Sequence, residues 1–215
     1  MTDASRPAPA ATPKHRRAYW LKQLHRWHWI SSAISLIGLL LFTITGITLN
    51  HAAEITAEPQ VNERRLTLPA PLLAQVAADE APDTTKPLPA PVAEWVEREL
   101  GVAARGNAEW SPEEINLPLP RPGGDGFVTI DRTDGTVVNE ITWRGWIAYL
   151  NDLHKGRNTG TVWKWFIDIF AIASLVFALT GLVLLYLHSK KRRSTWPLVG
   201  FGLLVPLILA IIFIH

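Results

Sequence analysis

Residues 30–49 read ISSAISLIGLLLFTITGITL, a run of twenty residues without a charged side chain. An α-helix rises about 1.5 Å per residue, so such a run spans the roughly 30 Å of hydrocarbon in a bilayer. Two more apolar runs of similar length follow at 162–187 and 197–214, and a membrane helix tolerates Pro206 inside the last one as a kink. The sequence therefore predicts a membrane protein with three transmembrane helices.

The composition agrees with this class. Of the 215 residues, 48% are hydrophobic and only 19% are charged, and the mean hydropathy is positive. These values do not fit an ordinary soluble protein. The chain has no cysteine, which excludes disulfide frameworks, thiolate metal sites, covalent c-type haem attachment and cysteine nucleophiles. Metal chemistry in this protein must therefore use His, Asp or Glu.

The distribution of charge predicts the orientation. The segments before the first span and after the second hold ten basic residues and one acidic residue, whereas residues 51–162 hold ten basic and seventeen acidic residues. Net charges of +9 and −7 follow, and the positive-inside rule places the two basic segments in the cytoplasm. The predicted order is a basic cytoplasmic segment at 1–28, transmembrane helices at 29–50, 162–188 and 197–215, an external domain at 51–161 and a basic cytoplasmic loop at 189–196.

The external segment is rich in proline, with eleven between Pro59 and Pro122 that indicate extended connectors. A helix is predicted at 91–100, where Pro lies near the start and Gly101 follows the end. Strands are predicted at 114–119, 127–131 and 136–142, with Asp134-Gly135 as a turn. A helix followed by an antiparallel hairpin makes a small α+β domain. It has no evident catalytic triad or phosphate loop, and we interpret it as a binding or spacing module.

Histidines carry the strongest chemical signal. Five of the seven lie at the edges of the first two spans: His25, His28 and His188 at the predicted inner edge, and His51 and His154 at the outer edge. One such histidine is adequately explained as an interfacial polar residue. Five together indicate a function, because polar groups at membrane boundaries are costly to desolvate and imidazole is a common metal ligand.

The first two spans also share a motif. Phe42-x-x-Thr45-Gly46-x-x-Leu49 matches Phe177-x-x-Thr180-Gly181-x-x-Leu184, each motif is preceded by Leu-His (24–25 and 153–154), and each is followed by a histidine. Because the two helices run in opposite directions, this is an inverted repeat. It predicts that His51 lies near His154, and that His25 or His28 lies near His188.

Two imidazoles facing each other between membrane helices are suited to bind b-type haem. Zinc is less favoured, because each edge supplies only two or three histidines and no evident adjacent carboxylate. Arg26, Lys155 and Arg157 are placed to neutralise haem propionates. His28 and His51 are 23 residues apart, or about 35 Å along a helix. Three arrangements remain open: both edges hold a haem that leans inward, one edge alone holds haem, or a homodimer shares ligands. One or two haem b groups are predicted.

The stretches LHRWHW at 24–29, SSAISLIGLLLFTITGITLNHA at 31–52, DLHKGR at 152–157 and WFIDIFAIASLVFALTGLVLLYLH at 165–188 resemble the PepSY-associated transmembrane family, over roughly residues 20–190. Members include inner-membrane ferric and ferri-siderophore reductases, which hold b-type haem between transmembrane histidines. The resemblance implies a PepSY-like external domain and implies His25, His51 and His154 as haem ligands, with His28 and His188 as extensions. This chain differs from larger members in having three spans and one external domain.

The leading hypothesis is a haem-containing ferric reductase of the bacterial inner membrane, which passes electrons to periplasmic Fe(III) or a ferric chelate so that Fe(II) can be imported. Glu54, Glu58 and Asp152 are candidates for an Fe(III) site beside the outer histidines. Asp168 either pairs with Lys164 or takes part in proton or iron handling. The chain has no nucleotide-binding fingerprint, so the electron donor is a quinol or a separate cytoplasmic reductase.

Two other hypotheses remain open. One is a non-enzymatic, membrane-anchored module whose external domain binds peptides or restrains a protease. The other is an electron-carrying subunit of a larger cytochrome complex. The lipid bilayer is a partner under every hypothesis, and no nucleic-acid partner is expected.

Overall fold

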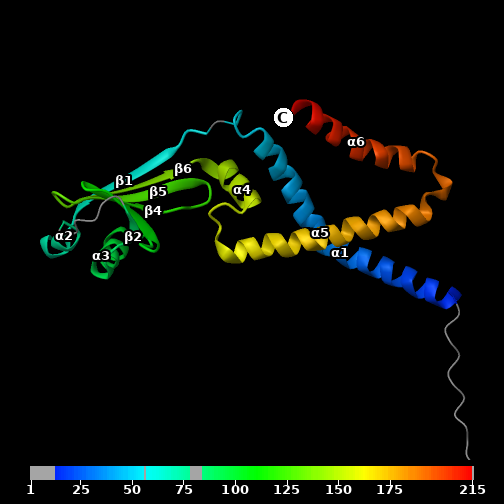
Figure 1. Ribbon diagram of the computed structural model, residues 1–215, viewed down its shortest axis with the longest axis horizontal. Coiled ribbons are helices and arrows are strands. Elements are labelled where there is room, and N and C mark those ends of the chain that lie inside the picture. The colour runs from blue at the N-terminus through cyan, green and yellow to red at the C-terminus, as the bar shows by residue number, and fades with distance from the viewer. Residues whose placement is uncertain (1–12, 56, 78–83, 215) are drawn as a thin grey trace, which may run out of the picture. The chain divides into compact units, whose positions relative to one another are not determined.

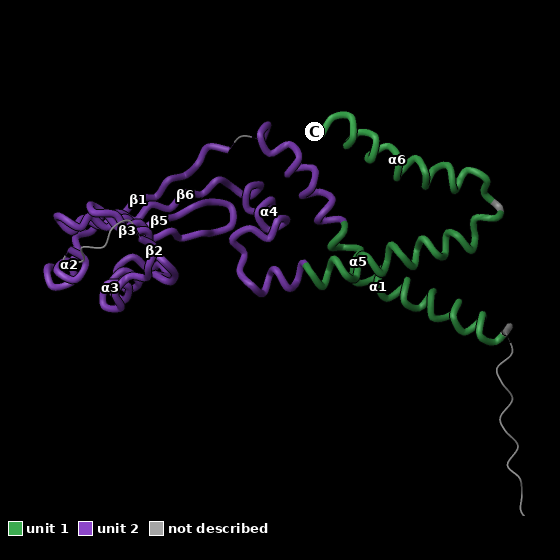
Figure 2. The backbone as a smooth tube through the Cα atoms, viewed as in Figure 1, with its two compact units in different colours: residues 1–39, 168–215 green, residues 40–167 purple. Residues whose placement is uncertain are grey.

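The computed structural model describes residues 13–55, 57–77 and 84–214. The chain divides into two compact units (Figure 2). Unit 1 contains the chain up to Leu39 and from Asp168 onward, and unit 2 contains Leu40–Ile167. The first twelve residues of the predicted basic N-terminal segment lie outside the described residues.

Three helices are long and apolar enough to cross a membrane, as the sequence predicted. They are α1 (Pro13–Asn50), α5 (Gly160–His188) and α6 (Thr195–Phe213), and the short 3₁₀ helix η1 (Ser189–Lys191) follows α5 (Figure 1). Helix α1 begins well before the predicted span, because good helix formers such as Lys, Arg, Leu and Gln extend the helix back to Pro13, and proline is favoured in a first helical turn. The chain is thus a multi-pass membrane protein by the length and composition of its helices.

Within unit 1, a row of small residues on α1 faces α5. Ser31, Ser35 and Gly38 lie at helical spacings of four and three, and the two serines are buried. A Cβ atom on residue 38 would overlap the ring of Phe170 of α5, which is itself buried. Small residues allow membrane helices to approach closely, and Gly38 leaves the space that the Phe170 ring occupies.

Unit 2 contains a six-stranded antiparallel sheet in the order β1-β6-β5-β4-β3-β2 (Figure 1). The strands are β1 (Gln60–Thr67), β2 (Thr84–Pro87), β3 (Asn107–Trp110), β4 (Glu114–Pro118), β5 (Gly124–Asp131) and β6 (Thr136–Trp143). Helices α2 (Ala70–Ala77) and α3 (Ala90–Leu100) cover one face of the sheet, and helix α4 (Gly145–Lys155) follows β6.

The core of unit 2 lies between the sheet and these two helices. It contains Val76 of α2, Val92 and Val96 of α3, and alternate residues of the central strands such as Ile115 and Val128, all fully buried. Helix α3 confirms the predicted helix, since its apolar residues recur at helical spacing and Gly101 ends it at a φ of 68°.

The predicted helix and hairpin account for only part of the external domain. The prediction missed strands β1, β2 and β3 and helix α4. Strand β1 lies at the edge of the sheet and is exposed on nearly all its residues, so it has no apolar alternation to reveal it. Strands β2 and β3 are only four residues long each. The PepSY-like region is therefore a six-stranded sheet rather than a hairpin.

The turn between β5 and β6 is formed by Asp134 and Gly135, as predicted. The Asp134 carboxylate accepts a hydrogen bond of 2.7 Å from the backbone N–H of Thr136, and Gly135 has a φ of 76°. Hydrogen bonding from Thr136 lowers the pKa of Asp134 below its ordinary value, because it stabilises the charged carboxylate. This turn fixes the register of the two longest central strands.

Candidate functional site: two histidine sites built by a repeated motif

The motif on α5 contacts a histidine of α1. The Nδ1 atom of His28 lies 3.0 Å from the Thr180 hydroxyl, and the imidazole stacks on Phe177 with ring centres 5.0 Å apart and planes 18° apart. The His28 ring is half-buried. We call His28, Phe177, Thr180 and Gly181 the His28 site; all four belong to unit 1.

The motif on α1 makes similar contacts with a histidine of α4, with the aromatic ring tilted by 46° rather than stacked. The Nδ1 atom of His154 lies 2.7 Å from the Thr45 hydroxyl, and its ring centre lies 4.9 Å from that of Phe42. His154 is also half-buried. We call Phe42, Thr45, Gly46 and His154 the His154 site; all four belong to unit 2. Phe, Thr and Gly of the repeat thus have one structural role at both positions.

The glycine of each motif leaves room for the imidazole. A Cβ atom on Gly181 would lie 3.2 Å from Cε1 of His28, and one on Gly46 would lie 3.6 Å from Cε1 of His154. The first distance is tighter than an ordinary van der Waals contact. The motif therefore supplies a hydroxyl, an aromatic face and an open backbone position, which together fix one ring.

The threonine hydroxyls determine which nitrogen carries the proton. Thr180 donates its single hydroxyl proton to the carbonyl of Val176 at 2.7 Å, and Thr45 donates to the carbonyl of Leu41 at 2.8 Å. A hydroxyl has one donor and two acceptor lone pairs. With its proton on the carbonyl, each threonine accepts from an Nδ1–H group, and this assignment leaves Nε2 of the neutral ring without a proton. An unprotonated Nε2 is the form in which imidazole binds a metal.

Replacement of Thr180 by valine is expected to free the tautomer of His28. The variant loses an acceptor worth about 1 kcal/mol, equivalent to roughly a fivefold change in the tautomer ratio. Nitrogen-15 NMR of histidine-labelled, haem-free protein would show the wild-type ring with a protonated Nδ1 and the variant ring as a mixture. Thr48→Val is the matched control, because Thr48 bonds Asn151 and no histidine. A wild-type His28 with its proton on Nε2 would contradict the assignment.

The other three of the five predicted histidines are exposed, and the Nδ1 atom of each lies near the backbone carbonyl four residues earlier. The Nδ1–O distances are 2.8 Å for His25, 3.0 Å for His51 and 2.8 Å for His188. A carbonyl only accepts hydrogen bonds, so Nδ1 carries the proton here as well. All five predicted histidines therefore leave Nε2 free for a ligand bond.

The structure brings together most of the predicted inner set. The rings of His25 and His188 lie 6.2 Å apart between centres, with planes at 85°. His28 lies in the same unit but contacts Thr180 and Phe177. The sequence match equated His25 with His154; the contacts instead make His28 the structural equivalent of His154.

His51 and His154 were predicted to lie near each other, but their rings are not in contact among the described residues. His154 contacts Thr45 of α1, which lies six residues before His51 in the sequence. The reason is helix α4, which the sequence did not reveal. It places His154 alongside the last turns of α1 rather than at the tip where His51 lies.

A cavity of about 700 Å³ adjoins the His28 site in unit 1. Thr180 forms part of its wall, and Trp20, Leu24, Trp27 and Val183 are among its mainly apolar lining residues. Arg17 also lines it, although no histidine does. The cavity thus has a mainly apolar wall with one cationic side chain.

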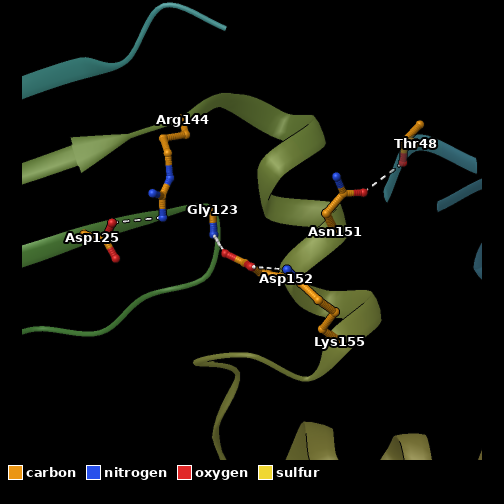
Figure 3. Close-up of polar contacts among 7 residues, drawn as sticks. All are labelled: Thr48, Gly123, Asp125, Arg144, Asn151, Asp152 and Lys155. Carbon is orange, nitrogen blue, oxygen red and sulfur yellow. Dashed lines mark hydrogen bonds and ion pairs between the residues drawn. The ribbon is translucent and has the colours of Figure 1, made fainter. Parts of the chain in front are cut away.

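The predicted Fe(III) carboxylates do not form a cluster. Glu54 and Glu58 are exposed, and no group of three or more His, Asp or Glu suited to a metal ion is found among the described residues. Asp152 is buried, and its Oδ2 accepts a 2.9 Å hydrogen bond from the backbone N–H of Gly123 (Figure 3). Its Oδ1 lies 3.8 Å from Lys155. Asp152 therefore joins α4 to the turn before β5, a structural role that the sequence did not indicate.

Asp152→Ala is expected to lower the free energy of unfolding by about 1–3 kcal/mol, because the buried N–H of Gly123 loses its acceptor. Thermal unfolding of the detergent-purified protein measures this as a lower melting temperature. Asp125→Ala is the control: Asp125 pairs with Arg144 at 2.9 Å but is half exposed, so its loss should cost about 0–1 kcal/mol. Equal melting temperatures for the two variants would refute the structural role of Asp152.

Lys164 and Asp168 are both exposed on α5. Neither side chain makes an ion pair within the part of the chain that the structure describes. The predicted pair is therefore not seen, and Asp168 has no assigned role.

Comparison with known proteins agrees with the sequence resemblance. The model of a family described as PepSY_TM-like matches residues 19–215, which include both histidine sites and the sheet. No curated protein and no solved structure matches the chain.

Proposed function

The chain belongs to the PepSY_TM-like family, and from this premise we propose that it is a haem b protein of the bacterial inner membrane that reduces ferric iron or a ferric chelate outside the cytoplasm. The observation that carries the proposal is the duplicated histidine site. Each copy fixes a half-buried imidazole through a threonine and leaves its Nε2 free. We assign one haem b to each copy.

The donors of the chain suit haem better than a metal ion held by protein alone. Haem iron needs only one or two imidazole ligands, whereas structural zinc takes four and catalytic zinc three protein ligands. The inner haem would be held by His28, with His25 or His188 as a second ligand, and the rings of His25 and His188 lie 6.2 Å apart in the same unit. The outer haem would be held by His154, with His51 as the predicted second ligand.

When bound, haem b supplies a one-electron redox centre that the side chains of this protein lack. The role of the chain is to hold and orient it. Thr45 and Thr180 bond Nδ1 and so would leave Nε2 free to bind the iron. Phe42 and Phe177 contact the two imidazoles and would restrict their rotation. Arg17 at the 700 Å³ cavity is placed to bind a propionate.

The charge distribution supports an outward direction of electron transfer. The segments flanking the membrane on one side carry a net charge of +9, which favours a cytoplasmic position, and residues 51–162 carry −7. An acidic outer surface attracts cationic iron, and Glu54 and Glu58 are exposed there. A quinol or a separate cytoplasmic reductase would supply the electrons, and a homodimer is compatible with this arrangement.

Proteoliposomes test the function directly. Ascorbate is trapped inside, a ferric chelate that does not cross the membrane is added outside, and Fe(II) is measured with an external chromogenic chelator. We expect Fe(II) to form outside only when the protein carries haem. Protein reconstituted without haem and empty liposomes are the controls. Equal rates from haem-loaded and haem-free protein would contradict the proposal, as would reduction of the haem by ascorbate with no Fe(II) outside.

A further inference from the structure

Helix α4 has its polar and apolar faces reversed relative to an ordinary surface helix. It buries Asn151 and Asp152 and leaves Trp146, Ile147 and Leu150 exposed, at 71%, 40% and 46%. These three apolar residues lie at helical spacings of one, three and four, so they share one face. A water-facing helix normally shows the opposite pattern.

Specific hydrogen bonds set this orientation. Asn151 accepts a 2.9 Å hydrogen bond from the Thr48 hydroxyl near the end of α1, and Asp152 accepts one from Gly123 beside the sheet (Figure 3). Arg144, just before the helix, pairs with Asp125 of β5. Protein groups thus bind the two buried polar side chains of α4, and its apolar side chains remain exposed.

Helix α4 is hydrogen-bonded to two helices that can cross a membrane. Within unit 2, Ile44 and Ile47 of α1 and Val162 and Trp165 of α5 are also exposed, at 57% or more in every case. The Trp163 indole N–H donates to the Leu153 carbonyl at 2.9 Å, which ties the start of α5 to the end of α4. The helix therefore lies next to two segments that are suited to lipid.

We infer that α4 lies in the membrane interface, with Trp146, Ile147 and Leu150 inserted among the lipids. Trp146 packs edge-on against Trp143 and Tyr149, at ring-centre distances of 5.6 and 5.7 Å, and such aromatic groups are favoured at the headgroup level. Interfacial helices insert an apolar face in this way while their polar groups stay outside the hydrocarbon. The occupant of the surface is the lipid bilayer, and its effect is to hold the sheet beside the membrane. This inference does not depend on haem.

Site-directed fluorescence tests this contact, and the absence of cysteine makes the labelling specific. Leu150→Cys and, as a second variant, Ile147→Cys are labelled with an environment-sensitive dye and placed in lipid nanodiscs. Spin-labelled lipid and aqueous iodide serve as quenchers. Ile44→Cys on α1 is the lipid-facing control, and Arg98→Cys on α3, whose side chain is 67% exposed, is the water-facing control.

We expect both α4 labels to be quenched by spin-labelled lipid to the same degree as the label at position 44, and to be protected from iodide. Quenching by iodide as at position 98, without quenching by lipid, would mean that α4 faces water. Protection from both quenchers would mean that a second copy or another protein covers this face. Either result overturns the inference.

Discussion

Alanine in place of His154 is expected to halve the haem content of the purified protein, and alanine in place of His28 is expected to halve it as well. Each substitution removes the imidazole of one of two equivalent sites and leaves the other intact. A pyridine haemochrome assay divided by protein concentration measures the ratio. The double variant should be colourless, because both sites then lack their fixed Nε2 ligand.

His15→Ala is the matched control for this pair. His15 is an exposed histidine of α1 that lies outside the five predicted ligands, and its loss should leave the haem content unchanged. Each variant is first shown to be monodisperse in detergent, so that lost haem is not confused with lost folding. Full haem content in the double variant would show that neither threonine-held histidine is a ligand.

Gly38→Val is expected to have the largest effect on stability. A side chain at position 38 would occupy the space of the Phe170 ring of α5. Overpacking a tight contact costs about 1–3 kcal/mol or more, and the Phe170 ring that would have to move is itself buried. Thermal unfolding in detergent should show a clearly lower melting temperature and a larger aggregated fraction.

Two further variants distinguish overpacking at residue 38 from a general loss of helix stability caused by replacing glycine with valine. Gly200→Val places the same side chain at a glycine of α6 that has no neighbour within 4 Å of the added Cβ, and it should be tolerated. Combining Gly38→Ala with Phe170→Ala should be less destabilising than the sum of the two single changes. Removal of the Phe170 ring relieves the clash with the new Cβ, and the new Cβ fills part of the space that the ring leaves. Strictly additive losses of stability would contradict overpacking against Phe170.

The sequence predicted the long helices well because their signal is local. Twenty apolar residues in series predict a span regardless of what surrounds them, and the apolar spacing of Val92, Val96 and Leu100 predicts α3 in the same way. The inverted repeat matched Phe, Thr and Gly between the two helices but predicted no role for them. Their contacts with an imidazole depend on the packing of helices, which no local pattern contains.

The contacts of the histidines could not be predicted from the sequence. His25 and His28 are three residues apart and so lie on neighbouring turns of nearly the same face, and spacing alone does not choose between them. The contacts with Phe177 and Thr180 select His28. His154 was expected to meet His51, but Thr45 lies six residues earlier on α1, about 9 Å along the helix. Only the position of α4 determines that shift.

Asp152 illustrates the same limit in the external part of the chain. Its carboxylate suggested a metal ligand, since it lies two residues from His154 in the sequence. In the structure it accepts a hydrogen bond from Gly123, which is 29 residues away. A buried carboxylate of this kind can be recognised only when its backbone partner is known.

The central claim is that two threonine-held histidine sites bind haem b. Its most direct test is the absorbance spectrum of detergent-purified wild-type protein from haem-replete cells, recorded before and after reduction by dithionite, together with the haem-to-protein ratio. The account predicts a red protein, a Soret band that shifts on reduction, and two haem b groups per chain. A colourless protein with no Soret band would contradict it.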